Sequence, residues 1–324
     1  MPIDLPSYPL LLGPTPLHPL PRFSAWLGGV EIWIKRDDLT PLALGGNKLR
    51  KLAFLLAEAL AQDATDLVTT GAAQSNHCRQ TAAAAARAGL GCHLVLRGRP
   101  DARPGGNILL DRLLGAELHW AGGPDTGPAL ARVVEDLRAA GRRPYAIPLG
   151  GSTPVGAAGY ADAWLEMSEQ ARALGIEFDA VVFATSSGGT QAGLAVGAGA
   201  AAWPGAIHGI SVDHKIPDLA AVTERLTQAT ADLLEIPTPH PVIVHDDYIG
   251  AGYGIVDDAD RKAIIALARS EGILVDPVYT GRALAGLIDL VRGGVLAGRV
   301  LFWHTGGAPA LFAYETDLLA DDGS

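Results

Sequence analysis

Short apolar strand patterns alternate with helical patterns through much of this chain, and this alternation is the feature that most constrains the fold. Residues 66–70 have the pattern of a strand, and an alanine-rich helical pattern follows over 79–88. The same order recurs further along, with strands expected at 92–96, 117–120 and 145–147 and helices at 107–114 and 129–140. Strands separated by helices predict βαβ units and therefore a mostly parallel sheet.

A second series of such units begins after a glycine-rich stretch at 150–159. A long helix is expected over 160–174, and buried strand patterns follow at 180–184, 207–212 and 300–304. The pattern predicts two α/β lobes with a boundary near residues 150–165. The first 25 residues are rich in proline and predict an extended arm, and residues 30–35 alternate like a strand.

The composition limits the kinds of partner. The chain has 324 residues, 48% of them hydrophobic and 19% charged, which is typical of a globular protein with a substantial core. Its net charge of −10 disfavours nucleic acid or an anionic membrane as the main partner. The N-terminal segment lacks the pattern of a secretory signal, and no apolar run is long enough to cross a membrane. We therefore expect a cytoplasmic protein.

One lysine, Lys48, stands at the start of a helical pattern over 47–62. Most lysines on such helices are solvated surface residues, and this is the default interpretation. A cation in the first helical turn opposes the helix dipole, however, so this position favours the neutral amine. A neutral amine can attack an aldehyde to form a Schiff base. Lys48 is therefore a candidate for that chemistry, with Asn47 as a plausible N-cap.

A glycine-rich turn follows the strand pattern at 180–184 and opens the next helix. Its residues Ser187, Gly188, Gly189 and Thr190 offer backbone N–H groups and hydroxyls that can converge on a phosphate. The turn lacks both the lysine of a nucleoside triphosphate loop and the full GxGxxG spacing of a dinucleotide site. An ordinary tight turn is the alternative interpretation.

Two further groups of polar residues lie beside turns. Residues 74–77 separate a strand from a helix, where their hydroxyl and amide donors could bind a substrate carboxylate; helix capping by Ser75 or Asn76 is the alternative. Tyr253 and Tyr279 are each flanked by turn residues, and simple loop packing is the alternative for both.

The histidines and cysteines show no close spacing typical of a metal site, so we expect none. This applies to His77, His93, His119, His208, His214, His240 and His245 among the nine histidines, and to both cysteines, Cys78 and Cys92. A GxSxG segment is absent as well, so the sequence does not support a serine hydrolase of that type.

Taken together, these segments resemble the fold type II pyridoxal phosphate (PLP) enzymes, which include tryptophan synthase β. More narrowly, they resemble the family of 1-aminocyclopropane-1-carboxylate (ACC) deaminase and D-cysteine desulfhydrase. The matching segments span nearly the whole chain, and their joint occurrence in order is specific. They are PTPL at 14–17, KRDD at 35–38, GGNKLRKL at 45–52, QSNHCRQTAAAAA at 74–86, SSGGTQAG at 186–193, DPVYTGRALAGL at 276–287 and HTGGAPALFAY at 304–314.

The resemblance implies two open, twisted, mostly parallel-sheet domains with flanking helices. Residues 1–47 and 163–324 would form the large PLP-binding domain, and residues 48–162 the small α/β domain. It also implies a homodimer that acts on a small amino acid. Lys48 would hold PLP as a Schiff base and move the Cα proton of the substrate.

The resemblance assigns the other site residues in the same way. The remaining cofactor-binding residues would be Asn76 at the phenolic oxygen, Ser187, Gly188, Gly189 and Thr190 at the phosphate, and Thr305 at the pyridine nitrogen. The catalytic residues beside Lys48 would be Ser75, Tyr253 and Tyr279. The substrate-binding residues would be Gln74, Ser75, Asn76, Tyr279, Thr280 and Gly306.

Two threonines bear on the substrate. Deaminases of this family typically carry Glu where this chain has Thr280 and Leu where it has Thr305, so both positions favour D-cysteine desulfhydrase. A hydroxyl at the pyridine nitrogen would leave it less protonated, which favours elimination. The expected reaction is the α,β-elimination of D-cysteine to pyruvate, hydrogen sulfide and ammonia. ACC deaminase, L-cysteate sulfo-lyase and a catalytically silent amino-acid or PLP sensor are the alternatives.

Overall fold

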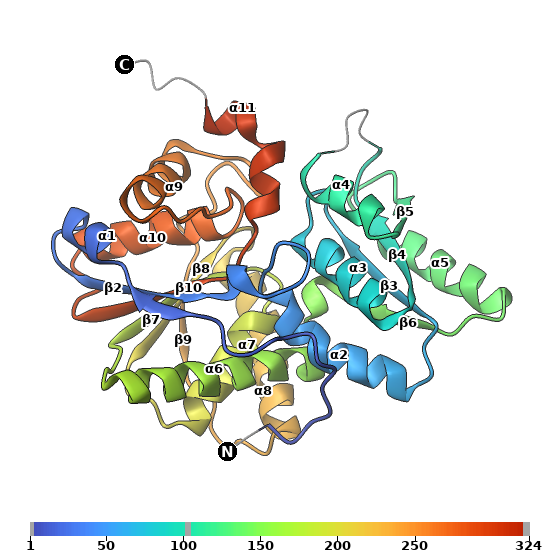
Figure 1. Cartoon of the computed structure of the whole chain (residues 1–324), viewed down its shortest axis with the longest axis horizontal. Helices are drawn as coiled ribbons and strands as arrows, with labels where there is room; N and C mark the ends of the chain where they lie inside the picture. Colours follow the sequence, from blue (N-terminus) through green and yellow to red (C-terminus); the bar gives the residue numbers. More distant parts are fainter. Residues whose placement is uncertain (1–2, 101–104, 320–324) are drawn as a thin grey trace.

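The chain forms two α/β lobes in a computed structural model that describes residues 3–100 and 105–319 (Figure 1). The larger lobe is built on a six-stranded sheet in the order β1-β2-β10-β7-β8-β9. β1 pairs antiparallel with β2, and the other neighbours pair in parallel. The strands are β1 (Leu17–Pro19), β2 (Glu31–Arg36), β7 (Ala180–Thr185), β8 (Ala206–Ser211), β9 (Val242–His245) and β10 (Arg299–His304).

The smaller lobe is built on a four-stranded parallel sheet in the order β5-β4-β3-β6. Its strands are β3 (Asp66–Gly71), β4 (Gly91–Leu96), β5 (Glu117–Trp120) and β6 (Pro144–Ile147). Both sheets therefore confirm the predicted α/β fold with mostly parallel strands.

Helices flank both sheets (Figure 1). Those beside the small sheet are α2 (Lys48–Ala61), α3 (Asn76–Ala88), α4 (Gly106–Leu113) and α5 (Gly127–Ala139). Those beside the large sheet are α1 (Pro21–Trp26), α6 (Pro154–Leu174), α7 (Gly189–Ala200), α8 (Ile216–Leu233), α9 (Asp258–Glu271), α10 (Thr280–Arg292) and α11 (Glu315–Leu318). Short 3₁₀ turns lie at η1 (Asp37–Leu39), η2 (Leu149–Gly151) and η3 (Ala308–Ala313).

The central strands are apolar on both faces because helices cover both sides of the sheet. Every residue of β7 is buried. Val182 packs in one core cluster with Leu284 of α10, whereas Phe183 on the opposite face packs with Trp164 of α6. This double cover produces the continuous hydrophobic runs that identify these strands in the sequence.

The structure differs from the sequence-based expectations at two helices. The N-terminal arm is not extended throughout, since α1 begins with Pro21 in a position where a missing N–H is tolerated. Helix α6 begins at Pro154, so part of the glycine-rich stretch is helical. A Cβ on Gly159 would lie 2.2 Å from the Arg50 carbonyl oxygen, so this glycine permits the close approach of α6 to α2. Because α6 continues unbroken through residues 162 and 163, we propose that the domain boundary lies before Pro154.

A buried polar network fixes α2 against the larger lobe. Arg50, in the first turn of α2, donates to Asp37 through Nε and Nη2 at 2.8–3.0 Å. Asp37 also accepts from Tyr160 (2.6 Å) and from Trp303 Nε1 (2.8 Å). Glu166 of α6 is paired with Arg50 at 2.9 Å. Arg50 holds the pKa of the Asp37 carboxyl below its usual range, although burial alone would raise it.

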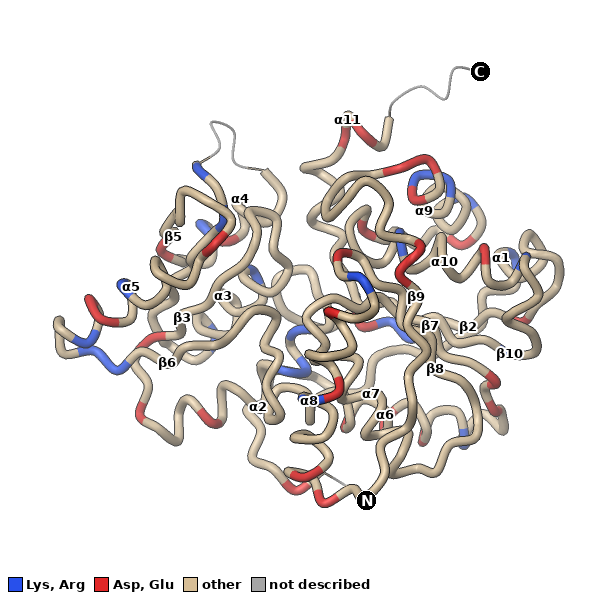
Figure 2. The backbone as a smooth tube through the Cα atoms, turned by 180° about the vertical axis from the view of Figure 1, so that it is seen from behind, with Lys and Arg blue, Asp and Glu red and all other residues tan. Residues whose placement is uncertain are grey.

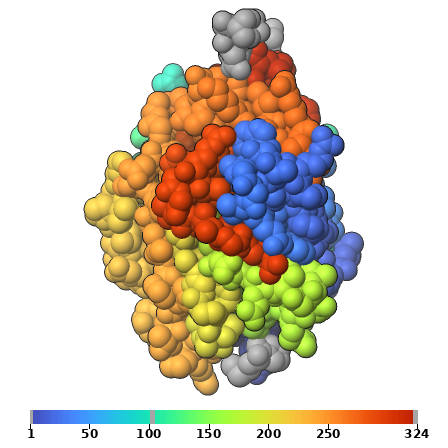
Figure 3. Space-filling view, turned by 90° about the vertical axis from the view of Figure 1, so that its left-hand side faces the viewer, coloured from blue at the N-terminus to red at the C-terminus, as the bar shows by residue number. Residues whose placement is uncertain are grey.

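An early and a late segment of the chain meet on the outer face of the larger lobe. The amide of Glu31 donates to the Gly298 carbonyl at 3.1 Å, and Figure 3 shows these early (blue) and late (red) segments side by side. Within the described ranges, none of the helices has the length and apolar character needed to cross a membrane.

Candidate active site

The site is a pocket of about 300 Å³ between the two lobes. It lies past the carboxyl ends of β3, β7 and β10, where parallel α/β sheets place their ligand sites. Basic residues lie at the centre of the molecule, where α2 begins (Figure 2). Of the residues predicted for the site, ten line this pocket: Lys48, Ser75, Asn76, Ser187, Gly188, Thr190, Tyr253, Tyr279, Thr305 and Gly306.

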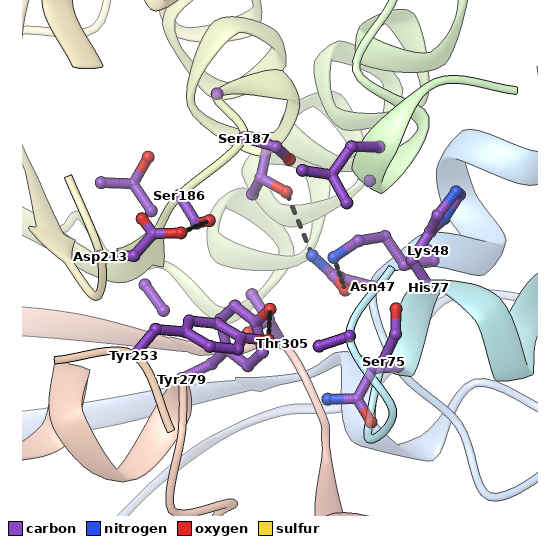
Figure 4. A pocket seen from close by; sticks show the side chains of 18 of the residues that line it. Asn47, Lys48, Ser75, His77, Ser186, Ser187, Asp213, Tyr253, Tyr279 and Thr305 are labelled. Atoms are coloured by element: carbon purple, nitrogen blue, oxygen red, sulfur yellow. Dashed lines mark hydrogen bonds between the residues drawn. The ribbon is translucent and has the colours of Figure 1, made fainter. Parts of the chain in front are cut away.

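Lys48 is the first residue of α2, and its side chain lines the pocket (Figure 4). The pKa of Lys48 is lowered to about 8, mainly because burial penalises the charged amine; Asp276 opposes this shift, and the cation of Arg79 contributes to it. A substantial fraction of the amine is therefore neutral near pH 8. Its Nζ donates to Asn47 Oδ1 at 2.9 Å.

Asn47 does not cap α2 with its side chain, contrary to the sequence-based expectation. Its Nδ2 donates to Thr190 Oγ1 at 3.1 Å, and its backbone N–H donates to the Thr305 carbonyl at 2.9 Å. Asn47 thereby joins the start of α2 to the glycine-rich turn and to the end of β10. The side chain is occupied by tertiary contacts that local sequence cannot indicate.

The glycine-rich turn forms a cradle at the start of α7. Gly188 occupies the N-cap position with φ of 82°, a left-handed conformation that favours glycine. Ser187 Oγ accepts a 2.8 Å hydrogen bond from Ser152 Oγ, and the N–H of Gly189 donates to the same Ser152 oxygen at 3.2 Å. The open N-terminus of a twelve-residue helix and these hydroxyls suit a phosphate group.

Lys51 adds a second amine to this cradle, although it was not among the residues predicted for the site. It lines the pocket, and a Cβ on Gly189 would lie 2.7 Å from its Nζ. Burial and the nearby Lys48 lower the pKa of Lys51 well below its ordinary value. An anion in the cradle would favour the charged form of Lys51 and would therefore offset much of this lowering of its pKa. The sequence does contain a clue to Lys51: it lies three residues after Lys48, and residues three apart share one face of a helix.

The start of α3 faces the pocket from the smaller lobe. Ser75 caps this helix by accepting from the Cys78 N–H at 3.2 Å, and it also lines the pocket. Asn76 Oδ1 accepts from Asn107 Nδ2 at 3.0 Å and from Arg79 at 3.4 Å. The capping and ligand-facing interpretations of this segment are thus compatible.

Two tyrosines close the opposite side of the pocket (Figure 4). The hydroxyls of Tyr253 and Tyr279 are 2.7 Å apart, and burial raises the pKa of both, so both stay protonated. Buried Asp276 fixes the loop before Tyr279 by accepting from the N–H groups of Val278 and Tyr279, each at 3.0 Å.

Comparison with known proteins assigns the family. The family model described as "Pyridoxal-phosphate dependent enzyme" matches residues 8–306. The chain belongs to this family. A solved structure of an ACC deaminase homologue is 38% identical, with a TM-score of 0.93 over 98% of this chain and 96% of that one.

More distant structures share the fold. A PLP-dependent aspartate racemase is 18% identical, with a TM-score of 0.66 over 90% of each chain. A hydrogen sulfide-producing enzyme from Fusobacterium nucleatum is 16% identical, with a TM-score of 0.67 over 92% of this chain and 97% of that one. The chain is a fold type II PLP enzyme, and PLP is its cofactor.

The residues present fit this cofactor. Lys48 offers an amine of lowered pKa to the aldehyde, and the α7 cradle with Lys51 suits the phosphate. Thr305, which carries a hydroxyl, lies directly after β10 and lines the pocket. PLP supplies an electron sink when it is bound, and the protein supplies its binding, orientation and electrostatics.

Two predicted substrate residues are directed elsewhere. Gln74 Nε2 donates to the Gly105 carbonyl at 3.1 Å, and its Oε1 accepts from the Asn107 N–H at 2.8 Å. The Thr280 hydroxyl is fully buried and donates to Asp276 Oδ1 at 2.7 Å. Neither lines the pocket, so their predicted contact with substrate would require a different arrangement of these side chains.

Ser186 and Asp213 are further pocket residues that were absent from the predicted set. Ser186 donates to Asp213 Oδ2 at 2.6 Å, and the pair lines the pocket beside the tyrosines (Figure 4). The other oxygen, Asp213 Oδ1, is buried without a hydrogen-bond partner. A buried free acceptor of this kind can bind a donor on a ligand. Asp213 follows β8, the strand beside β7. Its position just after a buried strand pattern is the sequence feature that could have identified it as a site residue.

Proposed function

We propose that this PLP enzyme catalyses the α,β-elimination of D-cysteine to pyruvate, hydrogen sulfide and ammonia, with one water consumed. The observation that carries the proposal is the position of Thr305 in the pocket at the end of β10. A neutral hydroxyl, in place of a carboxylate, would leave the pyridine nitrogen of the cofactor less protonated. A milder electron sink suits expulsion of a good leaving group such as a thiolate.

The proposed roles of the protein groups follow from the geometry. Lys48, which is partly neutral near pH 8, takes the proton from the substrate Cα. The Tyr253 and Tyr279 hydroxyls, both protonated and hydrogen-bonded, can deliver a proton to the departing sulfur. The free N–H groups at the start of α3, with Ser75, bind the substrate carboxylate.

ACC deaminase is the second candidate, because the 38% identical solved structure is named an ACC deaminase homologue. L-Cysteate sulfo-lyase is a third, because Arg97 and His214 line the pocket and could pair with a sulfonate. A catalytically silent sensor is the remaining alternative; one that holds PLP would also use the lowered pKa of Lys48, so turnover is what separates it from an enzyme.

A substrate panel tests the proposal directly. The purified holoenzyme is given D-cysteine, L-cysteine, β-chloro-D-alanine, L-cysteate and ACC, and the products are identified. We expect pyruvate with sulfide from D-cysteine. Formation of 2-oxobutyrate from ACC, or of sulfite from L-cysteate, without turnover of D-cysteine would contradict the proposal and select one of the alternatives.

Following the same family resemblance, we also propose that the enzyme is a cytoplasmic homodimer. Light scattering coupled to size-exclusion chromatography tests the dimer. A mass near the 33.6 kDa of one chain would exclude it.

A further inference from the structure

Two histidines and a glutamate meet on the edge of the small sheet, outside the active-site pocket. β4 and β5 pair in parallel, with His93 opposite Glu117 and Val95 opposite His119. Side chains two residues apart in a strand share a face, so His119 and Glu117 both stand beside His93. The spacing along the chain hides this group, because His93 is far from the other two in sequence.

The three side chains present ligand atoms at the separations that a metal ion requires. His93 Nδ1 lies 3.1 Å from His119 Nε2 and 3.6 Å from Glu117 Oε2. His119 Nε2 lies 3.5 Å from Glu117 Oε1. Tetrahedral zinc with bonds of about 2.0–2.2 Å separates its ligand atoms by roughly 3.3–3.6 Å. The imidazole centroids are 5.4 Å apart, so the two facing nitrogens lie between the rings.

A buried carboxylate orients one of these histidines from behind. His93 Nε2, the nitrogen directed away from the cluster, lies 3.4 Å from Asp66 Oδ1. Asp66 is buried and is held by Arg142 at 2.8 Å. A carboxylate behind a histidine fixes the tautomer that leaves the other nitrogen free to bind metal. From α5, Arg132 and Asp136 also act on His119, with opposite effects on its charge.

A second histidine pair provides a contrast within the same protein. His208 Nδ1 and His245 Nε2 are 3.0 Å apart on neighbouring strands, with stacked rings. Within residues 3–100 and 105–319, only the first pair has a third ligand group close enough to complete a site. A contact between two histidines is therefore insufficient for a metal site, and the nearby Glu117 distinguishes the first pair from the second.

We propose that His93, Glu117 and His119 bind one divalent ion of the zinc class, with water as the fourth ligand. Two imidazoles and one carboxylate are a known zinc ligand set. The ion would join the edge strand β5 to β4 and would stabilise the smaller lobe without contacting PLP.

The test uses chelator-treated holoenzyme titrated with Zn²⁺ by calorimetry and with Co²⁺ by visible absorption. We expect one ion per chain, a tetrahedral Co²⁺ spectrum and a higher Tm with zinc. His119→Gln and Glu117→Gln should each weaken zinc binding by more than about tenfold, the loss seen when even a group that only orients a ligand is removed. Both side chains are partly exposed, so the variants should fold.

His245→Gln is the matched control and should leave zinc affinity unchanged. The proposal is overturned if millimolar zinc does not bind, or if binding is the same in His119→Gln as in the native chain. Equal loss of affinity in His245→Gln would also overturn it. Turnover by the chelator-treated enzyme is measured in parallel and should not change.

Discussion

The hydroxyl of Tyr253 lies 2.7 Å from the hydroxyl of Tyr279, and the two rings meet edge to face with centroids 5.9 Å apart. One tyrosine belongs to a glycine-rich loop and the other to the turn before α10. Asp276 holds that turn by four hydrogen bonds, two of them from Thr280. Thr280 therefore acts on the pocket through the loop that positions Tyr279.

Removing either hydroxyl of this pair should slow the reaction. We expect Tyr279→Phe and Tyr253→Phe each to lower kcat by about 10²-fold, because a proton donor is lost while the apolar ring is kept. Steady-state kinetics with D-cysteine measures the effect. Tyr248→Phe is the control, since its hydroxyl bonds to Asp289 on the surface, and it should retain full activity. Unchanged kcat in both pocket variants would remove the tyrosines from the mechanism.

Mutation should distinguish the roles of Lys48 and Lys51, the two lysines of α2. Lys48→Ala should abolish turnover and the absorbance of covalently held PLP. Lys51→Ala should keep the covalent bond but weaken cofactor binding about ten- to hundredfold, because a charge-assisted hydrogen bond is worth about 1.5–3 kcal/mol. Absorption spectra and PLP titration of the apoprotein distinguish the two outcomes. Normal PLP affinity in Lys51→Ala would place that amine outside the phosphate site.

Cofactor uptake by the apoprotein should depend on pH through Lys48. Its pKa is lowered to about 8, so the reactive neutral amine increases as the pH rises through 8 and is protonated below that value. The rate of PLP attachment should therefore rise with pH to a plateau near pH 9. Stopped-flow absorbance measures this rate. A midpoint near the ordinary lysine value of about 10.4 would show that burial does not shift this amine.

The Asp37 network should be a main contributor to stability. Asp37→Ala leaves the Arg50 guanidinium buried without its main partner, which costs about 3–5 kcal/mol. Urea unfolding measures the loss in the free energy of unfolding. Lys215→Ala removes an exposed pair with Asp246 at 3.8 Å and should change stability by less than about 1 kcal/mol. Similar losses in the two variants would contradict a special role for the buried network.

The hydroxyl of Thr305 should matter for elimination. We expect Thr305→Leu to lower sulfide release from D-cysteine, because in the proposed arrangement no donor or acceptor then faces the pyridine nitrogen. Thr305→Ser keeps the hydroxyl and should keep most of the activity. If the leucine and serine variants release sulfide at the native rate, the argument from Thr305 to the reaction fails.

Periodicity predicts much of the fold, because buried parallel strands and amphipathic helices leave different repeats in a sequence. The strand at 180–184 and the helix from Thr190 are examples, and the structure places them at β7 and α7. Periodicity did not place α1 or the true start of α6. Proline and glycine there indicated loops, whereas the structure uses Pro21 as a helix start and Gly159 for close helix packing.

The sequence by itself determined the parallel α/β architecture and the order of the segments that line the pocket, and it singled out Lys48 as the candidate amine, because these depend on local patterns. Only the tertiary structure decided which side chains meet. It placed Lys51 beside the cradle at the start of α7, used Asn47 to join three elements, paired the Thr280 hydroxyl with Asp276 and brought His93 beside His119. Such contacts depend on strand register and helix packing between distant segments, and no local repeat in the sequence encodes them.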